Sequence, residues 1–225
     1  MTTAAAPPTT TRARVAELTA ALITRWQEGY LNDRPGDVAA LARLRRGAGR
    51  DAGDVPDLWG LVDTGALHTR TDSLRPLSEQ ELVRAENAVY AALTLWALHQ
   101  QSRGTRMHRP SRQDRQSAGL GAAVRRLMPA GGIDEAIRKR LVRAGTAPDL
   151  VGLAQRLRDI VVLLRRADIP LDYGLLAGQL YAWQWPDGPS AVRREWGRSF
   201  HAWQPAAPSE DTNPNPTTDT DKDAS

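Results

Sequence analysis

The apolar residues of this chain recur at the spacing of a helix face, and no segment keeps the period-two alternation typical of a β-strand. Near its end, Val192, Trp196, Phe200 and Trp203 lie at i, i+4, i+8 and i+11, on one side of a helix, with Arg194 opposite. We therefore predict an all-α fold of about nine helices. The expected helices are Arg14–Glu28, Gly36–Arg46, Asp57–Thr64, Ser78–Gln100, Leu120–Met128, Ile133–Arg143, Asp149–Arg166, Asp172–Trp183 and Pro189–Trp203.

Composition divides the chain into four parts. Residues 1–11 and 205–225 are polar and rich in proline, cannot bury a core, and are expected to be disordered N- and C-terminal tails. Between Gln101 and Gly119 the helical pattern lapses in a segment containing Gly, Pro and Ser. We therefore expect two helical-bundle halves: residues 12–117, including a basic connecting loop, and residues 118–204.

Arginine dominates the charge of the chain. Of 30 basic residues, 28 are arginine, and the whole chain carries a net charge of +4. The residues after Trp203 include five acidic side chains and one lysine, a net charge of −4, so the rest of the chain carries +8. Arginine binds phosphate through paired hydrogen bonds and stacks on bases. The surplus favours a polyanionic partner, although a GC-rich genome would also raise the arginine content.

Residues suited to catalysis or metal binding are not grouped in the sequence. The chain has no cysteine, no phosphate-binding glycine loop, no G-x-S-x-G and no H-E-x-x-H. Its four histidines, His68, His99, His108 and His201, stand far apart without a carboxylate at ligand spacing, so we expect them to be partly exposed. We predict no enzyme activity, no cofactor, no metal and no catalytic residue.

No segment predicts export or insertion into a membrane. The first residues lack a basic start followed by an apolar run, and the longest apolar run, Ala88–Leu98, is shorter than a bilayer requires. We expect a cytoplasmic protein without membrane contact.

Three sets of basic residues are candidates for binding phosphate. Arg43, Arg46 and Arg50 share a face if their helix continues past two glycines, whereas Arg45 lies nearer the apolar stripe. The connecting loop, expected to be weakly structured, repeats arginine at every third position: Arg103, Arg106, Arg109, Arg112 and Arg115. The third set is scattered over helices: Arg125, Arg126, Arg138, Lys139, Arg140, Arg143, Arg194 and Arg198. The alternative for the first set is a solvated helix face, and for the second a flexible linker. For the third set it is weak ion pairs on the surface.

Several short motifs occur in a recognisable order. They are LARLRRG at Leu41–Gly47, LWALHQ at Leu95–Gln100, LGAAVRRL at Leu120–Leu127, DYGLLAGQLYAWQ at Asp172–Gln184 and VRREWGRSF at Val192–Phe200. With these motifs, the chain resembles the CasB family, the small subunit of Cascade, the type I-E CRISPR surveillance complex. The resemblance covers most of Leu41–Phe200.

The resemblance implies a function. CasB-like subunits are all-α, have two helical-bundle halves and are not nucleases. Two copies lie against the backbone subunits that hold the guide RNA. Their basic surface helps to hold the target and displaced DNA strands of the R-loop. The partners implied are the guide CRISPR RNA, both DNA strands, other Cascade subunits and a second copy of the chain.

The candidate nucleic-acid-binding residues come from two sources. The family motifs contain Arg43, Arg45, Arg46, Arg125, Arg126, Arg193, Arg194 and Arg198. Charge alone adds Arg50, Arg103, Arg106, Arg109 and Arg112. Tyr173 and the tryptophans could stack on bases, but their helical spacing predicts the core. An adaptor whose basic face binds an acidic protein, and a small helical transcription regulator, are the alternative functions.

Overall fold

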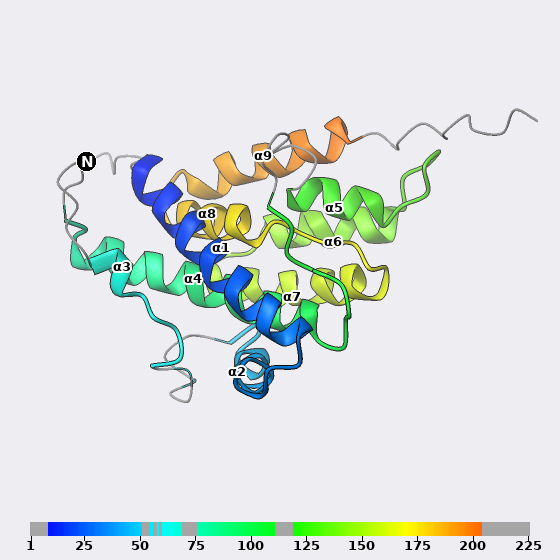
Figure 1. Cartoon of the computed structure of the whole chain (residues 1–225). Helices are drawn as coiled ribbons and strands as arrows, with labels where there is room; N and C mark the ends of the chain where they lie inside the picture. Colours follow the sequence, from blue (N-terminus) through cyan, green and yellow to red (C-terminus); the bar gives the residue numbers. More distant parts are fainter. Residues whose placement is uncertain are drawn as a thin grey trace, which may run out of the picture.

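The computed structural model describes residues 9–50, 55, 58, 60–68, 76–110 and 119–203. Within these residues the chain forms nine α-helices and no β-strand, which confirms the all-α prediction (Figure 1). The helices are α1 Thr9–Leu31, α2 Pro35–Arg46, α3 Gly65–His68, α4 Glu79–Gln100, α5 Leu120–Arg126, α6 Glu135–Gly145, α7 Leu150–Arg166, α8 Tyr173–Trp183 and α9 Gly188–Ala202.

Two of the observed helices differ most from the prediction. Helix α1 begins at Thr9, so residues 9–11 are helical rather than part of a disordered end. Of the helix expected at Asp57–Thr64, the described residues 60–64 are not helical, and α3 begins just after that range, at Gly65. The reason is local, because Gly60 has a φ of +76°, which no right-handed helix contains. Residues 1–8 and 205–225, also predicted to be disordered, lie outside the described residues.

Side-chain caps explain where four helices begin. A capping box begins α4: Ser78 Oγ accepts from the Glu81 N–H at 3.3 Å, and Glu81 Oε2 accepts from the Ser78 N–H at 2.9 Å. The carboxylates of Asp134, Asp149 and Asp172 accept from backbone N–H groups in the first turns of α6, α7 and α8. The sequence therefore sets these starting points locally.

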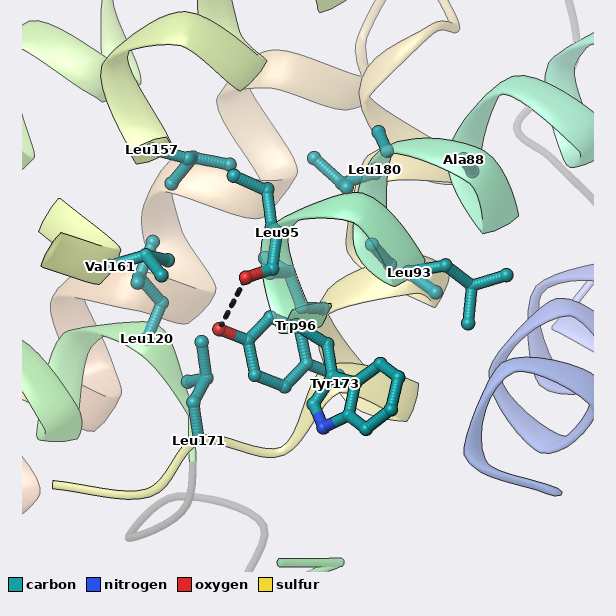
Figure 2. Packing of buried hydrophobic residues seen from close by; sticks show 14 of the residues in the cluster. Ala88, Leu93, Leu95, Trp96, Leu120, Leu157, Val161, Leu171, Tyr173 and Leu180 are labelled. Carbon is teal, nitrogen blue, oxygen red and sulfur yellow. Dashed lines mark hydrogen bonds between the residues drawn. The ribbon is translucent and has the colours of Figure 1, made fainter. Parts of the chain in front are cut away.

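Helix α4 lies at the centre of the core and packs against α1, α2, α7 and α8. Trp96 is fully buried on α4 and stacks on Trp26 of α1, with ring centroids 6.5 Å apart. Tyr173 lies beside it, and its hydroxyl is 3.5 Å from the carbonyl oxygen of Leu95 (Figure 2). Trp183 and Trp196 are also buried, so the prediction that these aromatic residues form the core is confirmed.

The two predicted halves share this core. Helices α1 and α4 of the N-terminal half pack directly on α8 of the C-terminal half, and buried residues from both belong to one hydrophobic cluster. On the far side of α8, helix α9 packs on α8 and α5, and α6 joins α5 to α7. The dividing line at residues 117 and 118 stays a prediction.

Candidate nucleic-acid interface

Residues 101–110, the first part of the basic loop, are anchored at both of their ends. Gln100 donates from Nε2 to the carbonyl oxygens of Arg103 and Thr105 at 3.0 and 2.8 Å, and accepts from the Met107 N–H at 3.0 Å. The Leu171 N–H then bonds to the Met107 carbonyl at 3.0 Å. The expectation of a weakly structured segment is therefore wrong for residues 101–110. Arg112 and Arg115 lie outside the described residues.

Gln27 of α1 also holds this loop, through hydrogen bonds to the backbone of His108. Its amide accepts from the His108 N–H at 2.9 Å and donates to the His108 carbonyl at 3.2 Å, as a neighbouring strand would. Its Oε1 also accepts from Trp96 Nε1 at 3.4 Å. Gln27, His108 and Trp96 are all buried, so one side chain satisfies three polar groups away from water.

Two of the four histidines are part of this anchor. His99 and His108 are buried, so the expectation that they are partly exposed is wrong, whereas His201 is exposed. His99 Nδ1 lies 2.9 Å from the Tyr173 hydroxyl, and His108 Nδ1 accepts from the Tyr173 N–H at 3.1 Å. Burial, followed by the charge of Arg165, lowers the pKa of His99 to about 3. Burial also lowers the pKa of His108, against the opposing effect of Asp172.

Mild acid should therefore destabilise the protein. The folded pKa of His99 is about 3 against 6.5 in the unfolded chain, so between these pH values the unfolded state binds a proton that the native state does not. Stability from this histidine is complete above pH 6.5 and falls as the pH drops towards 3. We expect urea unfolding at pH 5.5 to give a free energy about 1.4 kcal/mol lower than at pH 7.5 from His99 alone, and the lowered pKa of His108 adds to this loss.

The exposed His201 provides the control for this pH effect. A His201→Gln variant should lose the same free energy of unfolding between pH 7.5 and pH 5.5, because that side chain is exposed. Equal unfolding free energies at the two pH values in the wild-type protein would contradict a buried, neutral His99.

The anchored loop presents two arginines to solvent. Arg106 and Arg109 are exposed on either side of the buried pair Met107 and His108. They flank a hollow of about 540 Å³ at the end of α1, lined by Leu31, Gly104, Thr105, Arg106, His108, Arg109 and Pro110. The burial of the residues between them therefore fixes where both guanidinium groups emerge.

Arg126 of α5 extends this positive region. Desolvation, and then the charge of Arg109, lower the pKa of Arg126, so these two cations lie close enough to repel each other. Among the described residues, Arg106, Arg109 and Arg126 form no ion pair with a carboxylate. We call Arg106, Arg109 and Arg126 the hollow arginines. Their arrangement leaves three cations available to an anion from outside the chain.

Other candidate arginines nearby are already engaged within the protein. Arg103 pairs with Asp168 at 3.0 Å. Arg125 donates to the carbonyl oxygens of Pro129 and Ala130 at 2.9 and 3.1 Å, and its guanidinium lies over the Trp203 ring, 5.5 Å from its centroid. These two residues therefore position the loop and α5 in this structure.

The α2 and α9 sets lie elsewhere. Arg43 and Arg46 are exposed on α2 and Arg45 is half-buried. The helix ends at Arg46, as predicted, so it does not continue to Arg50, the condition under which Arg50 would share its face: Gly47 caps it, and Gly49 turns the chain with a φ of +80°. Arg194 and Arg198 are exposed on α9, opposite its buried face, as predicted. Helices α2 and α9 lie at opposite ends of the molecule in Figure 1, so the candidate arginines form several patches.

Sequence patterns did not indicate the residues that hold this surface in place. Gln27, Gln100 and His108 were not singled out as anchors, and neither was the pair between Arg12 and Glu195, whose oxygens accept at 2.8 and 2.6 Å. Burial alone would raise the pKa of Glu195, yet the hydrogen bonds from Arg12 bring it below its usual value. One sequence signal could have indicated these anchors: a polar residue directly beside the apolar face of a helix, as Gln27 is beside Trp26 and Gln100 beside His99.

The described residues contain neither a candidate metal site nor a membrane-spanning helix. Within them, no three His, Asp or Glu side chains are grouped to hold a metal ion. No helix in the described part of the chain is both long enough and apolar enough to cross a bilayer.

Comparison with known proteins places the chain in a family. The family model described as CRISPR-associated protein Cse2 matches residues 40–201. The crystal structure of CasB from Thermobifida fusca is similar over 84% of this chain and 98% of that chain, with 49% sequence identity and a TM-score of 0.73. The chain belongs to the CasB/Cse2 family of CRISPR-associated proteins. This confirms the family resemblance drawn from the sequence motifs.

Two more distant structures are similar to this CasB/Cse2 family member. The crystal structure of M. ruber CasB has 26% identity and a TM-score of 0.51, covering 72% of this chain and 83% of that one. A chain described as part of a CRISPR RNA-guided surveillance complex has 24% identity and a TM-score of 0.58, covering 83% and 93%, and shares the fold. No curated protein sequence matches the chain.

Proposed function

We propose that this CasB/Cse2 family member is a non-catalytic small subunit of a type I-E CRISPR surveillance complex, Cascade. Its basic surface would stabilise the R-loop by holding the phosphate backbones of the target and displaced DNA strands. The other partners proposed are the guide CRISPR RNA, the remaining Cascade subunits and a second copy of the chain. Membership of the family and the similarity to Thermobifida fusca CasB support this role.

One structural observation carries the proposal: Arg106 and Arg109 flank a hollow, Arg126 lies near Arg109, and among the described residues no carboxylate neutralises these three cations. The hollow arginines come from the loop and from α5, and none forms an ion pair among the described residues. Elsewhere, arginines on the surface do find acids, as Arg138 does with Glu135 at 2.7 Å. An anion from another molecule is the natural occupant, and phosphate suits the planar guanidinium.

Contacts to phosphate alone are sufficient for this role. In RNA-guided recognition, base pairing with the guide reads the sequence, and the protein needs to recognise the backbone and its shape. Tyr173, Trp96, Trp183 and Trp196 are buried and therefore unable to stack on bases without unfolding. Because R-loop formation is nearly balanced in free energy, a few phosphate contacts can shift the equilibrium.

Binding of the purified chain to single-stranded DNA should depend steeply on salt. We expect the double variant Arg106→Gln and Arg109→Gln to bind about tenfold more weakly at low salt, because each lost phosphate contact removes counterion release. The slope of log affinity against log salt concentration should become about 1.4 units shallower, about 0.7 for each contact. Fluorescence anisotropy across a salt series measures both quantities.

The variant Arg138→Gln is the matched control, because its guanidinium is exposed but already paired with Glu135. It should leave both affinity and slope nearly unchanged. Equivalent changes at Arg43 with Arg46, and at Arg194 with Arg198, compare the other two patches. If the wild-type chain binds no nucleic acid at low salt, alone or assembled with guide RNA and the other subunits, the adaptor alternative is favoured.

A further inference from the structure

We propose that the acidic segment 204–225 of this chain binds its own hollow arginines and competes there with nucleic acid. The proposal concerns the surface formed by Arg106, Arg109 and Arg126, and its occupant is a part of the same molecule. Its direct test requires no nucleic acid, whereas its consequence for affinity rests on the proposed function. The segment would thereby suppress binding to nucleic acid that no guide has selected.

The position of Trp203 is the first argument. Trp203 follows α9 immediately, and its ring lies under the guanidinium of Arg125, 5.5 Å from the ring centroid to Cζ. Arg125 and Arg126 are consecutive residues of α5. The acidic segment therefore begins directly after a residue that contacts α5, the helix whose last residue is Arg126. Arg126 lies close enough to Arg109 for the two charges to interact.

Charge complementarity is the second argument. The segment carries five carboxylates, Glu210, Asp211, Asp219, Asp221 and Asp223, against Lys222, a net charge of −4. The hollow arginines supply three positive charges that form no ion pair among the described residues. Mutual repulsion between Arg109 and Arg126 favours the arrival of an anion at this place.

Chain length allows the contact. An extended chain spans roughly 3.3 to 3.6 Å per residue, so Glu210 can lie up to about 25 Å from Trp203, and the acids from Asp219 onward much farther. A tethered ligand acts at an effective concentration that reaches the millimolar range for short linkers. Weak ion pairs, each worth little between separate molecules, can therefore populate the bound state.

Contact of the segment with the hollow can be observed directly. The chain has no cysteine, so Thr220→Cys gives a single site for a nitroxide spin label between Asp219 and Asp221. At low salt we expect selective NMR line broadening for the amides of residues 104–109 and Arg126. The broadening should disappear at about 1 M salt, where the Debye length is about 3 Å. It should also disappear when the five acids are changed to Asn or Gln.

Two results of that experiment would overturn the proposal. Line broadening spread evenly over the surface would show that the segment does not prefer the hollow. Unchanged broadening after neutralisation of the five acids would show that charge does not hold it. A segment with five conservative changes at its threonines and asparagines, which keeps the charge, serves as the control and should behave like the wild type.

Affinity for single-stranded DNA gives the second readout. Neutralising the five acids should tighten binding about threefold to tenfold at low salt, and the gap should close at high salt. In a chain carrying Arg106→Gln, Arg109→Gln and Arg126→Gln, neutralisation should have no further effect. If neutralising the acids still tightened binding in that triple variant, the acidic segment would act by general repulsion of DNA, and docking at the hollow would be overturned.

The two measurements separate this proposal from the proposed function. If the chain binds no nucleic acid, the spin-label experiment still decides whether the segment occupies the hollow. If the chain binds nucleic acid as expected but the label broadens no hollow residue selectively, the proposal fails and the proposed function stands.

Discussion

Changing Gln27 to methionine should lower the free energy of unfolding by about 3 to 5 kcal/mol. Methionine keeps the length of the side chain but has no amide. The His108 N–H, the His108 carbonyl and Trp96 Nε1 would then lose their partner inside the core. Each buried polar group left without a hydrogen bond costs about 1 to 3 kcal/mol. Urea unfolding at pH 7.5, followed by circular dichroism, measures the loss.

The same substitution should also affect the surface loop. Amide hydrogen exchange at His108 should speed up, because its N–H is bonded to the amide oxygen of Gln27. Nucleic-acid binding should weaken even at temperatures where the variant stays folded, because Arg106 and Arg109 flank the anchored pair. The exposed Gln155 on α7 gives a matched control: Gln155→Met should leave stability, exchange and binding nearly unchanged.

Wild-type stability in the Gln27→Met variant would show that water replaces the amide without loss, and that Gln27 does not anchor the loop. A variant that loses stability while binding nucleic acid with the wild-type salt dependence would separate the two roles. In that case the anchor would serve the fold and not the interface.

The second large effect is expected at the contact between α5 and α9. Gly121, in the first turn of α5, lies against the backbone of α9, and a Cβ atom added there would be 2.7 Å from the Phe200 nitrogen and closer still to the Trp196 carbonyl oxygen. Backbone atoms cannot move aside as a flexible side chain can. Gly121→Ala should therefore force the helices apart and lower the unfolding free energy by about 3 kcal/mol.

Gly197 of α9 provides an internal control with the opposite sign. A Cβ atom added at Gly197 meets nothing within 4 Å, and the residue lies inside a helix. Gly197→Ala should therefore raise the unfolding free energy by up to about 1 kcal/mol through helix propensity alone. Thermal unfolding of both variants gives the comparison. If Gly121→Ala is as stable as the wild type, α5 and α9 do not approach as closely as described.

Separation of α5 from α9 should also disturb the candidate interface. Arg126 is the last residue of α5, and Trp203, which follows α9, lies against Arg125. A shift of α5 would therefore change the distance between Arg126 and Arg109. We expect Gly121→Ala, in the fraction that remains folded, to weaken binding to single-stranded DNA, whereas Gly197→Ala should not.

Local signals explain why most of the fold was predictable. Amphipathic spacing indicated α1, α4, α7 and α9, and the Ser78 capping box marked the start of α4, since both depend on residues only three or four positions apart. The short α3 was misplaced, because four residues contain too little periodicity to indicate a helix. Buried His99 and His108 were wrongly expected to be partly exposed, because burial depends on distant elements.

The candidate site was less predictable than the fold. Arg103, Arg106 and Arg109 look equivalent in the sequence, at every third position of one loop. In the structure, Arg103 pairs with Asp168, sixty-five residues away, while Arg106 and Arg109 flank a hollow. Nothing within the loop distinguishes them, because the deciding acid comes from beyond the end of α7.

The sequence by itself determined the helices, the family and the surplus of arginine, since each can be recognised from local spacing and composition. The tertiary structure alone decided which arginines keep a positive charge available to another molecule. Gln27 and Gln100 hold the loop in place, and the packing of α5 on α9 positions Arg125 and Arg126. Asp168 neutralises the charge of Arg103 by forming an ion pair with it. The physical reason is that hydrogen bonds and ion pairs act over a few ångströms in space, and the chain brings their partners together only when it folds.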